Sequence, residues 1–302
     1  MIAKYYPMIS IVIPSYNQGC YLEETINSIL NQKYPNIQLI IIDGESDDNT
    51  TDIARNYSES IDYFISEKDS GQANALNKGF LVARGDICAY INSDDIYLDN
   101  IFWKISDKYL KEKFKWICSD VLIGASVDDS KVWEPKTISY ESFCVEQTIG
   151  QQGVFWENNS LKKPWFDENL QYAMDHKFFL SLYKKFGPPH YLKEKGSFFR
   201  IHKNSKTSKF QEILFKERKI ITLNEANHAN SGVQKRKIML ERKRLNLKIQ
   251  ISQKFSIMAK KLEFKSKLYY FLLILLIFLK APFKFRDGYF LGYLKKSLYL
   301  FK

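Results

Sequence analysis

The stretch Ile9-Ser-Ile-Val-Ile-Pro-Ser-Tyr-Asn17 holds the pattern on which the fold depends, an apolar run that ends in a proline and polar side chains. Its first five residues are mostly β-branched, which predicts a buried strand. The pattern returns at Gln38–Asp43, Tyr63–Ser66 and Ile87–Ile91, and polar residues follow each run. The sequence therefore predicts four strands that each end where a group of polar side chains begins.

Segments with helical periodicity separate these strands, at Tyr21–Asn31, at Asp47–Tyr57 and from near Gly71. Alternation of strands and helices with short connections predicts a parallel sheet with helices on both faces. Ligands of such sheets bind beyond the carboxyl ends of the strands, so we expect the four polar groups to line one site. Further along the chain we expect a helix at Asp99–Lys113, a strand at Lys115–Ser119, a helix at Asp175–Phe186 and a looser region at His202–Lys209.

The net charge of +11 is concentrated near the end of the 302-residue chain. Residues 234–302 hold 18 lysines and arginines against three acidic residues, a balance of +15 that leaves −4 for the rest. With 45% hydrophobic residues, the composition is that of a globular protein. The charge asymmetry predicts an anionic partner surface for the tail alone.

The cysteines and the first residues indicate the compartment. Four scattered cysteines include no Cys-x-x-Cys pair, and residues 1–8 contain no long apolar run. We therefore expect reduced thiols, no zinc site, no disulfide and no secretory signal peptide, which together predict a cytoplasmic protein.

The tail after Asn230 has a composition of its own. Lys235–Lys267 is basic and predicts a helix, and Leu268–Leu279 is an uninterrupted apolar run between lysines. That run is shorter than the roughly 18–20 residues needed to span a bilayer. Because Lys284–Lys302 alternates aromatic residues with lysines, an interfacial anchor on an anionic membrane is one interpretation. A helix packed on the globular part is the other.

The group Asn92-Ser-Asp-Asp95 is the strongest chemical signal in the chain. Two adjacent carboxylates at a strand end are typical oxygen ligands for Mg²⁺ or Mn²⁺. The alternative is an ordinary solvated turn. The other groups have similar alternatives: Asp43 as a turn former, Asp175 as a helix-dipole carboxylate, and Trp165 as a core or lid residue.

Taken in order, the motifs resemble those of glycosyltransferase family 2, over about residues 9–205. The first block is the more specific one and a second block is similar to the acceptor half of that family. The first block consists of Ile11-Val-Ile-Pro-Ser-Tyr-Asn-Gln18, Leu22-Glu-Glu-Thr-Ile26, Ser28-Ile-Leu-Asn-Gln32, Ile42-Asp-Gly-Glu-Ser-Asp-Asp-Asn-Thr50, Ser66 to Gly79, and Gly85-Asp86 with Ile91-Asn-Ser-Asp-Asp95. The second consists of Gly150-Gln-Gln-Gly-Val-Phe155, Phe166-Asp-Glu168 and Tyr172-Ala-Met-Asp175.

The resemblance implies an α/β GT-A fold, with a Rossmann-like, mostly parallel sheet, and an inverting, metal-dependent hexosyl- or N-acetylhexosaminyltransferase. It implies Asp175 as the general base and Asp94 as a ligand of Mg²⁺ or Mn²⁺, with Asp95 and His202 as further candidate ligands. The residues that would bind the nucleotide sugar are Pro14, Ser15, Tyr16, Asn17, Asp43, Lys68, Gln72, Asn77, Asn92 and Ser93. The residues that would contact the acceptor are Gln151, Gln152 and Trp165.

Two positions depart from the family pattern. Asn92 stands where the first aspartate of the Asp-x-Asp motif is expected, which removes one formal charge. Gly44 stands where a second aspartate often follows the second strand, so a contact that needs this carboxylate is lost.

The resemblance also divides the chain and gives it a role. Residues 1–96 would bind the nucleotide sugar, 97–229 the acceptor, and 230–302 would form the basic tail. We expect a UDP-sugar donor, a glycan or lipid-linked glycan acceptor, a part in surface polysaccharide biosynthesis, and a peripheral location on the inner face of the plasma membrane.

Two other classes of function fit single features. A nucleic-acid-binding protein would explain the basic tail, but the globular part is acidic, so we expect no nucleic acid partner. A catalytically inactive carbohydrate-binding protein would explain Asn92. A dinucleotide oxidoreductase is disfavoured, because no Gly-x-Gly-x-x-Gly follows the first strand.

Overall fold

The computed structural model describes residues 5–136, 138–203 and 211–261. The chain divides into two compact units, Met1–Arg242 and Lys243–Lys302, and helix α9 (Gly232–Lys261) runs from the first into the second. Residues 232–261 confirm part of the helix expected in the basic tail. The expected apolar run Leu268–Leu279 and the stretch Lys284–Lys302 lie outside the described residues.

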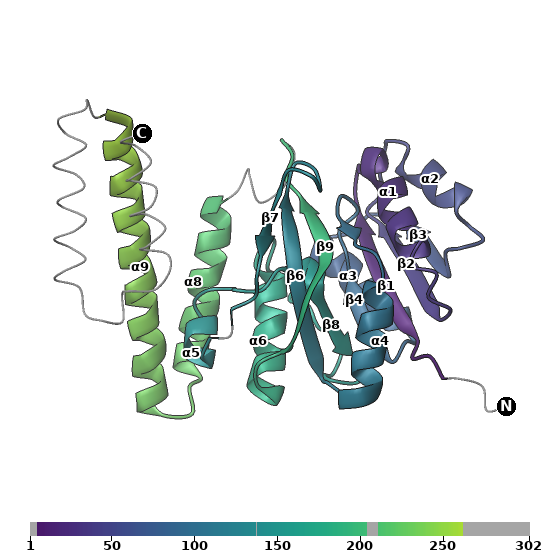
Figure 1. The fold of residues 1–302 in the computed structure, drawn as a ribbon. Coiled ribbons are helices and arrows are strands. Elements are labelled where there is room, and N and C mark those ends of the chain that lie inside the picture. Colours follow the sequence, from purple (N-terminus) through teal and green to yellow (C-terminus); the bar gives the residue numbers. More distant parts are fainter. Residues whose placement is uncertain (1–4, 137, 204–210, 262–302) are drawn as a thin grey trace. The chain divides into compact units, whose positions relative to one another are not determined.

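The first half forms the expected parallel sheet (Figure 1). Its strands are arranged in the order β3-β2-β1-β4 and all run parallel. Their observed bounds match the expected ones to within two residues: β1 Ile9–Ser15, β2 Ile37–Asp43, β3 Tyr63–Ser66 and β4 Ile87–Tyr90. Since β1, β2 and β4 are buried on both faces, they are continuous apolar runs rather than alternating ones.

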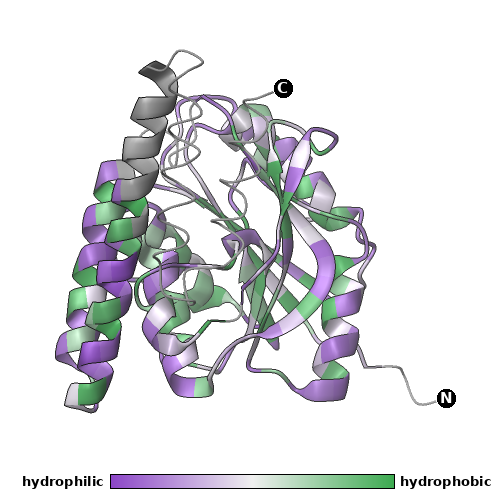
Figure 2. Ribbon diagram, turned by 60° about the vertical axis from the view of Figure 1, so that its left-hand side comes forward, coloured by the Kyte–Doolittle hydropathy of each residue, from purple (hydrophilic) through white to green (hydrophobic). Residues whose placement is uncertain are grey.

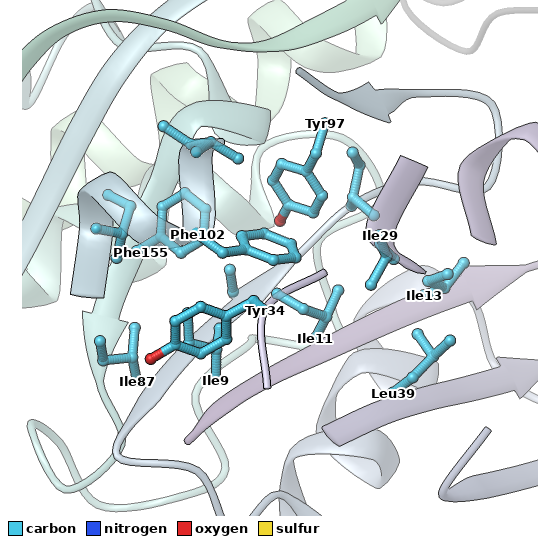
Figure 3. Packing of buried hydrophobic residues seen from close by; sticks show 14 of the residues in the cluster. Ile9, Ile11, Ile13, Ile29, Tyr34, Leu39, Ile87, Tyr97, Phe102 and Phe155 are labelled. Carbon is cyan, nitrogen blue, oxygen red and sulfur yellow. The ribbon is translucent and has the colours of Figure 1, made fainter. Parts of the chain in front are cut away.

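Helices cover both faces of this parallel half. Alternate residues of β1, including Ile11, pack with α1 (Gly19–Leu30) and α4 (Ile101–Glu112) in the buried cluster drawn in Figure 3. On the opposite face lies α3 (Gln72–Val82), and Gly79 allows it to approach closely, because a Cβ there would lie 2.5 Å from a methyl group of Val12. The helix α2 (Thr50–Asn56) packs beside α1.

The second half extends the same sheet with mixed strand directions. Within the described residues nine strands form one sheet, and β8, β6, β9 and β5 continue it beyond β4. Only β6 and β9 pair in parallel, whereas β8, β5 and β7 are antiparallel to their neighbours. The bounds are β5 Ile96–Tyr97, β6 Trp116–Gly124, β7 Ser130–Trp133, β8 Val154–Glu157 and β9 His190–Arg200.

The helices of the second half include one that the sequence did not reveal. The expected helix is α6 (Met174–Phe186), whose Phe178 ring packs 4.9 Å from the ring of Trp156. The unexpected helix is α8 (Gln211–Asn227), along which hydrophilic and hydrophobic residues are mixed (Figure 2) and in which Glu217 is buried on the same face as Ile221. Shorter elements are α5 (Tyr140–Phe143) and a 3₁₀ turn, η1 (Gln151–Gly153). Among the described residues, no helix combines the length and apolar character that a bilayer crossing requires.

Candidate active site

The register of the parallel strands brings their polar ends together. Ser15 at the end of β1 lies opposite Asp43 of β2, and Asp43 lies opposite Ser66 of β3. Backbone bonds continue past the strands, since the Gly44 N–H donates to Ser15 O at 2.9 Å and the Glu67 N–H to Asp43 O at 3.0 Å. Three of the polar groups expected from the sequence therefore meet at one edge of the sheet.

Asp43 holds the turn after β2 in place. Its carboxylate is fully buried and accepts bonds from the Ser46 N–H at 2.9 Å, the Ser46 hydroxyl at 2.5 Å and the Ser66 hydroxyl at 2.6 Å. A carboxylate has about four acceptor positions. A nucleoside contact by Asp43 therefore depends on the one position that these bonds leave.

An exposed aromatic ring lies beside this turn. The Tyr16 side chain is 62% exposed, and a Cβ at Gly44 would lie 3.4 Å from the Tyr16 ring and 2.9 Å from a carboxylate oxygen of Asp69. Asp69 thus lies against the backbone at the position where the family pattern has its second aspartate. At the end of β1, next to Tyr16, the Ser15 hydroxyl is buried and has no hydrogen-bond partner among the described residues. Pro14 is buried within the strand.

The residue Asn17 joins the first two loops. It has a left-handed backbone conformation, with φ of 50°, which asparagine tolerates better than most residues. Its N–H donates to the Ser46 hydroxyl at 2.8 Å, and its side-chain oxygen accepts from the Asp47 N–H at 3.0 Å. The loops after β1 and β2 are therefore one hydrogen-bonded unit.

Three candidates around α3 have different environments. Lys68 is exposed, and the amide of Gln72 donates to the side-chain oxygen of Asn92 at 2.6 Å, which links α3 to the loop after β4. Asn77 is buried, and its amide group bonds to Phe166 and Glu168. Asn77 therefore positions the loop at 166–168, an environment that differs from the donor contact expected of it.

The carboxyl group of Asp95 is fully buried and surrounded by donors. One oxygen accepts from the Arg200 N–H at 2.9 Å, and the other accepts from Gln152 at 2.8 Å and from Asn92 at 3.0 Å. Burial raises the pKa of Asp95 well above its usual range, and the neighbouring charge of Asp94 adds to this effect. Asp95 thus holds the loop together, and because its carboxylate is fully buried with three accepted bonds, a metal contact by Asp95 depends on the one acceptor position that these bonds leave.

Asp94 and His202 form the pair that remains for a metal ion. The Nε2 atom of His202 lies 2.9 Å from a carboxylate oxygen of Asp94. A carboxylate oxygen suits Mg²⁺ or Mn²⁺, Mg²⁺ is commonly held by one or two carboxylates and substrate phosphates, and the imidazole nitrogen is a further ligand for a first-row metal ion. No group of three or more His, Cys, Asp or Glu residues in the described part of the chain is arranged to hold a metal. The pair therefore fits a divalent ion only if a bound substrate supplies further oxygens.

His202 follows the end of β9, which places it beside the loop that carries Asp94. Arg200 donates from Nε to the backbone oxygen of Asp94 at 3.0 Å and from Nη2 to Glu24 at 2.6 Å. The Tyr21 ring packs 4.9 Å from the His202 ring, which half-buries the histidine. The resemblance offered His202 as a candidate ligand, but nothing in the sequence revealed β9 or its pairing with β6, which bring His202 beside Asp94.

The expected acceptor residues lie inside the fold. Gln151 donates to the backbone oxygen of Tyr90 at 2.8 Å, and Gln152 donates to Asp95. The Trp165 ring is 9% exposed and packs against the rings of Phe80 and Phe178. Trp165 is thus a core residue, the alternative that the sequence already offered, while the two glutamines brace the loop after β4. Ser93 is also buried, and its backbone oxygen accepts from a threonine of α1.

Asp175 is the second residue of α6 and lies in the first turn of that helix. Its carboxylate accepts from the Gln147 amide at 2.9 Å and from the His176 N–H at 2.7 Å. Burial raises the pKa of Asp175, and these two hydrogen bonds and the charge of Arg218 oppose the rise. A carboxylate with a raised pKa in a partly buried position is suited to accept a proton.

The segment 147–152 connects the two acidic centres. Gln147 donates to Asp175 at 2.9 Å, and Gln152, five residues later, donates to Asp95 at 2.8 Å. Between them, Gln151 donates to the backbone oxygen of Tyr90 at the end of β4 at 2.8 Å. Burial raises the pKa of Tyr90, and the charges of Asp175 and Asp95 raise it further.

Asp69 was not selected from the sequence although it lies in the Ser66–Gly79 motif, because its position beside Gly44 is seen only in the fold. Gln147 and Arg200 were not selected because they reach the site through long-range contacts that no local motif marks.

Comparison with known proteins supports the fold and the class. The family model described as Glycosyl transferase family 2 matches residues 10–179. A putative teichuronic acid biosynthesis glycosyltransferase of Bacillus subtilis, TuaG, is 29% identical over 214 residues, which are 67% of this chain and 82% of that protein. An uncharacterized glycosyltransferase of Haemophilus influenzae is 30% identical over 224 residues, 69% of this chain and 86% of that protein.

Solved structures share the fold at low sequence identity. TarS 1–349 of S. aureus in complex with UDP-GlcNAc aligns with a TM-score of 0.62 at 17% identity, covering 78% of this chain and 71% of that one. The chain covers 47% of a longer TarS structure. A mannosyltransferase of Pyrobaculum calidifontis in complex with GDP-Man and Mn²⁺ has a TM-score of 0.54 at 12% identity, covering 99% and 86% of the two chains.

Proposed function

The chain belongs to glycosyl transferase family 2, and from this premise we propose that it transfers a hexosyl or N-acetylhexosaminyl group, with inversion, from a UDP-sugar to a glycan. The observation that carries the proposal is that the segment 147–152 connects the Asp175 carboxylate with the loop of the Asp94–His202 pair, because Gln147 donates to Asp175 and Gln152 donates to Asp95. A single displacement needs two groups: a metal position that stabilises the departing phosphates, and a base that accepts the proton of the attacking hydroxyl.

The nucleotide is assigned to the loops after β1, β2 and β3. Tyr16 offers an exposed ring for stacking, and Asp69 offers a carboxylate beside it. Pro14, Ser15 and Asn17 shape this surface, with Lys68 at its exposed rim. Gln72 and Asn92, joined by their hydrogen bond, come next along the edge and are assigned to the sugar and phosphates. The UDP and UDP-GlcNAc complexes of TarS support a uridine nucleotide.

The diphosphate position is assigned to Asp94 and His202. A bound Mg²⁺ or Mn²⁺ would supply charge neutralisation for the departing nucleotide. The Mn²⁺ complex of the Pyrobaculum mannosyltransferase supports this assignment, and so does the donor set of the pair. Asp95, Gln152 and Arg200 hold the loop that carries Asp94 and are assigned no direct contact with the metal.

Asp175 is assigned as the general base. It takes the proton of the acceptor hydroxyl as that oxygen attacks the anomeric carbon from the side opposite the nucleotide. The sugar–phosphate bond breaks as the new glycosidic bond forms, so the anomeric configuration inverts. The acceptor is therefore assigned to residues 97–229 and the donor to residues 1–96.

The acceptor is proposed to be a growing surface polysaccharide or its lipid-linked form, an assignment that rests on the similarity to TuaG. We propose that the protein is cytoplasmic and binds the inner face of the membrane through its tail. Exposed Lys235, Arg236 and Lys237 of α9 support an anionic partner. Flotation of the full chain with anionic vesicles, and its absence with zwitterionic ones, is expected; equal behaviour with both would exclude the electrostatic anchor.

A donor screen tests the central proposal. The full chain is incubated with Mn²⁺ or Mg²⁺ and a panel of UDP-, GDP- and dTDP-sugars, and the released nucleoside diphosphate is measured. Metal-dependent release from a UDP-sugar, lost in Asp94→Ala, is expected. If no donor is turned over and none binds by calorimetry, the transferase proposal fails and the inactive carbohydrate-binding protein takes its place.

A further inference from the structure

The helix α8 lies beyond the residues that the family model matches, yet its inward face touches the site. Glu217 is 7% exposed, and Ile221 and Thr222 lie one turn further along the same face. Acidic side chains are rarely this buried without a specific partner. The buried charge of Glu217 therefore calls for an explanation that packing alone does not give.

The partner of Glu217 is the backbone just before α6. One carboxylate oxygen accepts from the Gln171 N–H at 2.8 Å, and the other accepts from Tyr172 at 2.9 Å and Ala173 at 2.8 Å. Backbone N–H groups at the start of a helix attract anions. Glu217 thus caps α6 from another helix and fixes the backbone two residues before Asp175.

The same helix is tied to the segment that supplies Gln147. Thr222 donates to the backbone oxygen of Cys144 at 2.9 Å, and Glu225 accepts from the Tyr140 hydroxyl at 2.6 Å. Gln147 follows three residues after Cys144 and donates to the Asp175 carboxylate. α8 therefore joins the two segments that determine where this carboxylate lies.

Arg218 adds a positive charge at the same place. Its Nε atom is buried without a hydrogen-bond partner among the described residues, and its charge acts on Asp175 and Glu146. Other titratable groups in this region include Tyr90 of β4, Glu217, Glu146 beside Gln147, and the adjacent His176. Burial and the Arg218 charge lower the pKa of His176 to about 3, so the imidazole is neutral. Arg218 is thus the cation that favours the ionised form of Asp175.

We propose that Glu217 and Arg218, adjacent on the inward face of α8, are positioning residues for the Asp175 carboxylate, so that a helix outside the family match completes the active site. Glu217 sets the backbone from which Asp175 projects, and Arg218 stabilises its charge. This inference rests on the proposed role of Asp175 as the base.

The test compares matched variants of the full chain. Arg218→Met and Glu217→Gln remove the inward charges, whereas Lys219→Met and Glu212→Gln remove the same charges from exposed positions of the same helix. Two quantities are measured, the pH dependence of kcat and the titration of the Asp175 carboxyl carbon by NMR, with its resonance identified by its loss in Asp175→Asn.

For Arg218→Met we expect the acidic limb of the kcat profile and the Asp175 titration to move to higher pH, because the Arg218 charge lowers the pKa of Asp175 and the variant removes that charge. Arg218→Lys should restore most of the shift. If Arg218→Met does not fold, the uncharged Arg218→Gln replaces it. Unchanged titration of Asp175 in the folded variant would overturn the role of Arg218.

For Glu217→Gln we expect kcat to fall about tenfold with the donor KM changed by less than twofold, together with a changed Asp175 titration. A variant that behaves like Glu212→Gln in both measurements would overturn the role of Glu217. The NMR titration does not need turnover, so it decides this inference even if the wild-type chain shows no transferase activity. In that case the proposed function fails separately.

Discussion

The donor half (residues 5–96) and the acceptor half (residues 97–203 and 211–229) place their acidic groups in different ways. In the donor half, Asp43 and Asp95 each bond to a residue three positions away within their own motif, and their further partners, among them Ser66 and Gln152, lie 23 or more positions away. In the acceptor half, Asp175 bonds to a residue 28 positions away, and the backbone before it bonds to one that is 44 positions away. Short-range contacts leave a motif in the sequence, whereas long-range contacts leave none.

The largest expected effect is a loss of kcat that comes from a change in the acceptor half alone. Asp175→Asn keeps the shape but removes the proton acceptor, and general-base catalysis is worth about 10²–10⁴-fold. We expect kcat to fall by this amount while the donor KM stays within about twofold. Steady-state kinetics measure both, and the exposed Asp128→Asn is the control. A collapse of donor binding with normal turnover of the bound donor would assign Asp175 to the donor half instead.

The same assignment predicts the direction in which kcat of the wild type changes with pH. Because burial raises the pKa of Asp175, the base becomes protonated at a higher pH than an exposed aspartate would. We expect kcat to be lost as pH falls through this raised pKa. A profile that stays flat down to the ordinary range of aspartate would contradict the assignment of Asp175 as the base.

The next effect concerns the metal position, to which the donor half contributes Asp94 and the acceptor half contributes His202. We expect Asp94→Ala to lower kcat by about 10²–10³-fold, the usual cost of removing one electrostatic stabiliser of developing charge. His202→Ala should have a similar effect, and the double variant should be little worse than either, because the two side chains act as a pair 2.9 Å apart. Asp99→Ala, an exposed neighbour, is the control. Strictly multiplicative losses would mean that the two residues act separately.

How much the sequence could predict follows from the same contrast. The strands of the parallel half were placed to within two residues, because each is a buried apolar run with a polar end. Asp94 was selected from its motif, whereas its partner His202 lies 108 positions away and needed β9 to bring it there. The helix α8 was missed because Glu217 and Arg218 interrupt its buried face, which weakens the apolar periodicity.

Asp95 and Trp165 show the limit of motifs even where they apply. The motif placed Asp95 beside Asp94 but gave no sign that three donors surround it. Whether an aromatic residue faces a substrate or the core depends on its packing partners, and Trp165 has Phe80 and Phe178. Burial is a property of the folded chain, and a sequence pattern indicates it only for regular elements.

A smaller effect tests the departure at Gly44. A side chain there would begin 2.9 Å from Asp69, so Gly44→Asp should displace that carboxylate and crowd the Tyr16 ring. We expect the donor KM to rise about tenfold, or ~1.4 kcal/mol, with kcat nearly unchanged. Gly44→Asp combined with Asp69→Gly should recover part of the loss. Gly232→Asp, at a position with nothing within 4 Å of the new Cβ, is the control. An unchanged KM would remove Asp69 from the nucleoside surface.

The smallest expected effect concerns the stability of the acceptor half and not its turnover, and it depends on His176. His176 is fully buried, its Nε2 lies 2.6 Å from the backbone oxygen of Phe143, and its Nδ1 has no partner among the described residues. Burial, with the Arg218 charge, lowers its pKa from 6.5 to about 3. Below about pH 6.5 His176 is protonated in the unfolded chain but remains neutral in the folded chain. The free energy of unfolding therefore decreases as the pH falls.

Between pH 7 and pH 5 this cost is about 2 kcal/mol. Urea unfolding of the wild type and of His176→Gln at both values measures it, with the exposed His228→Gln as the control. We expect the wild type to lose about 2 kcal/mol more than His176→Gln over this interval, and the control to follow the wild type. Equal losses in all three would mean that the histidine can be charged inside the fold. Water would then reach the interior of the acceptor half, and the effect of the Arg218 charge on the pKa of Asp175 would be screened.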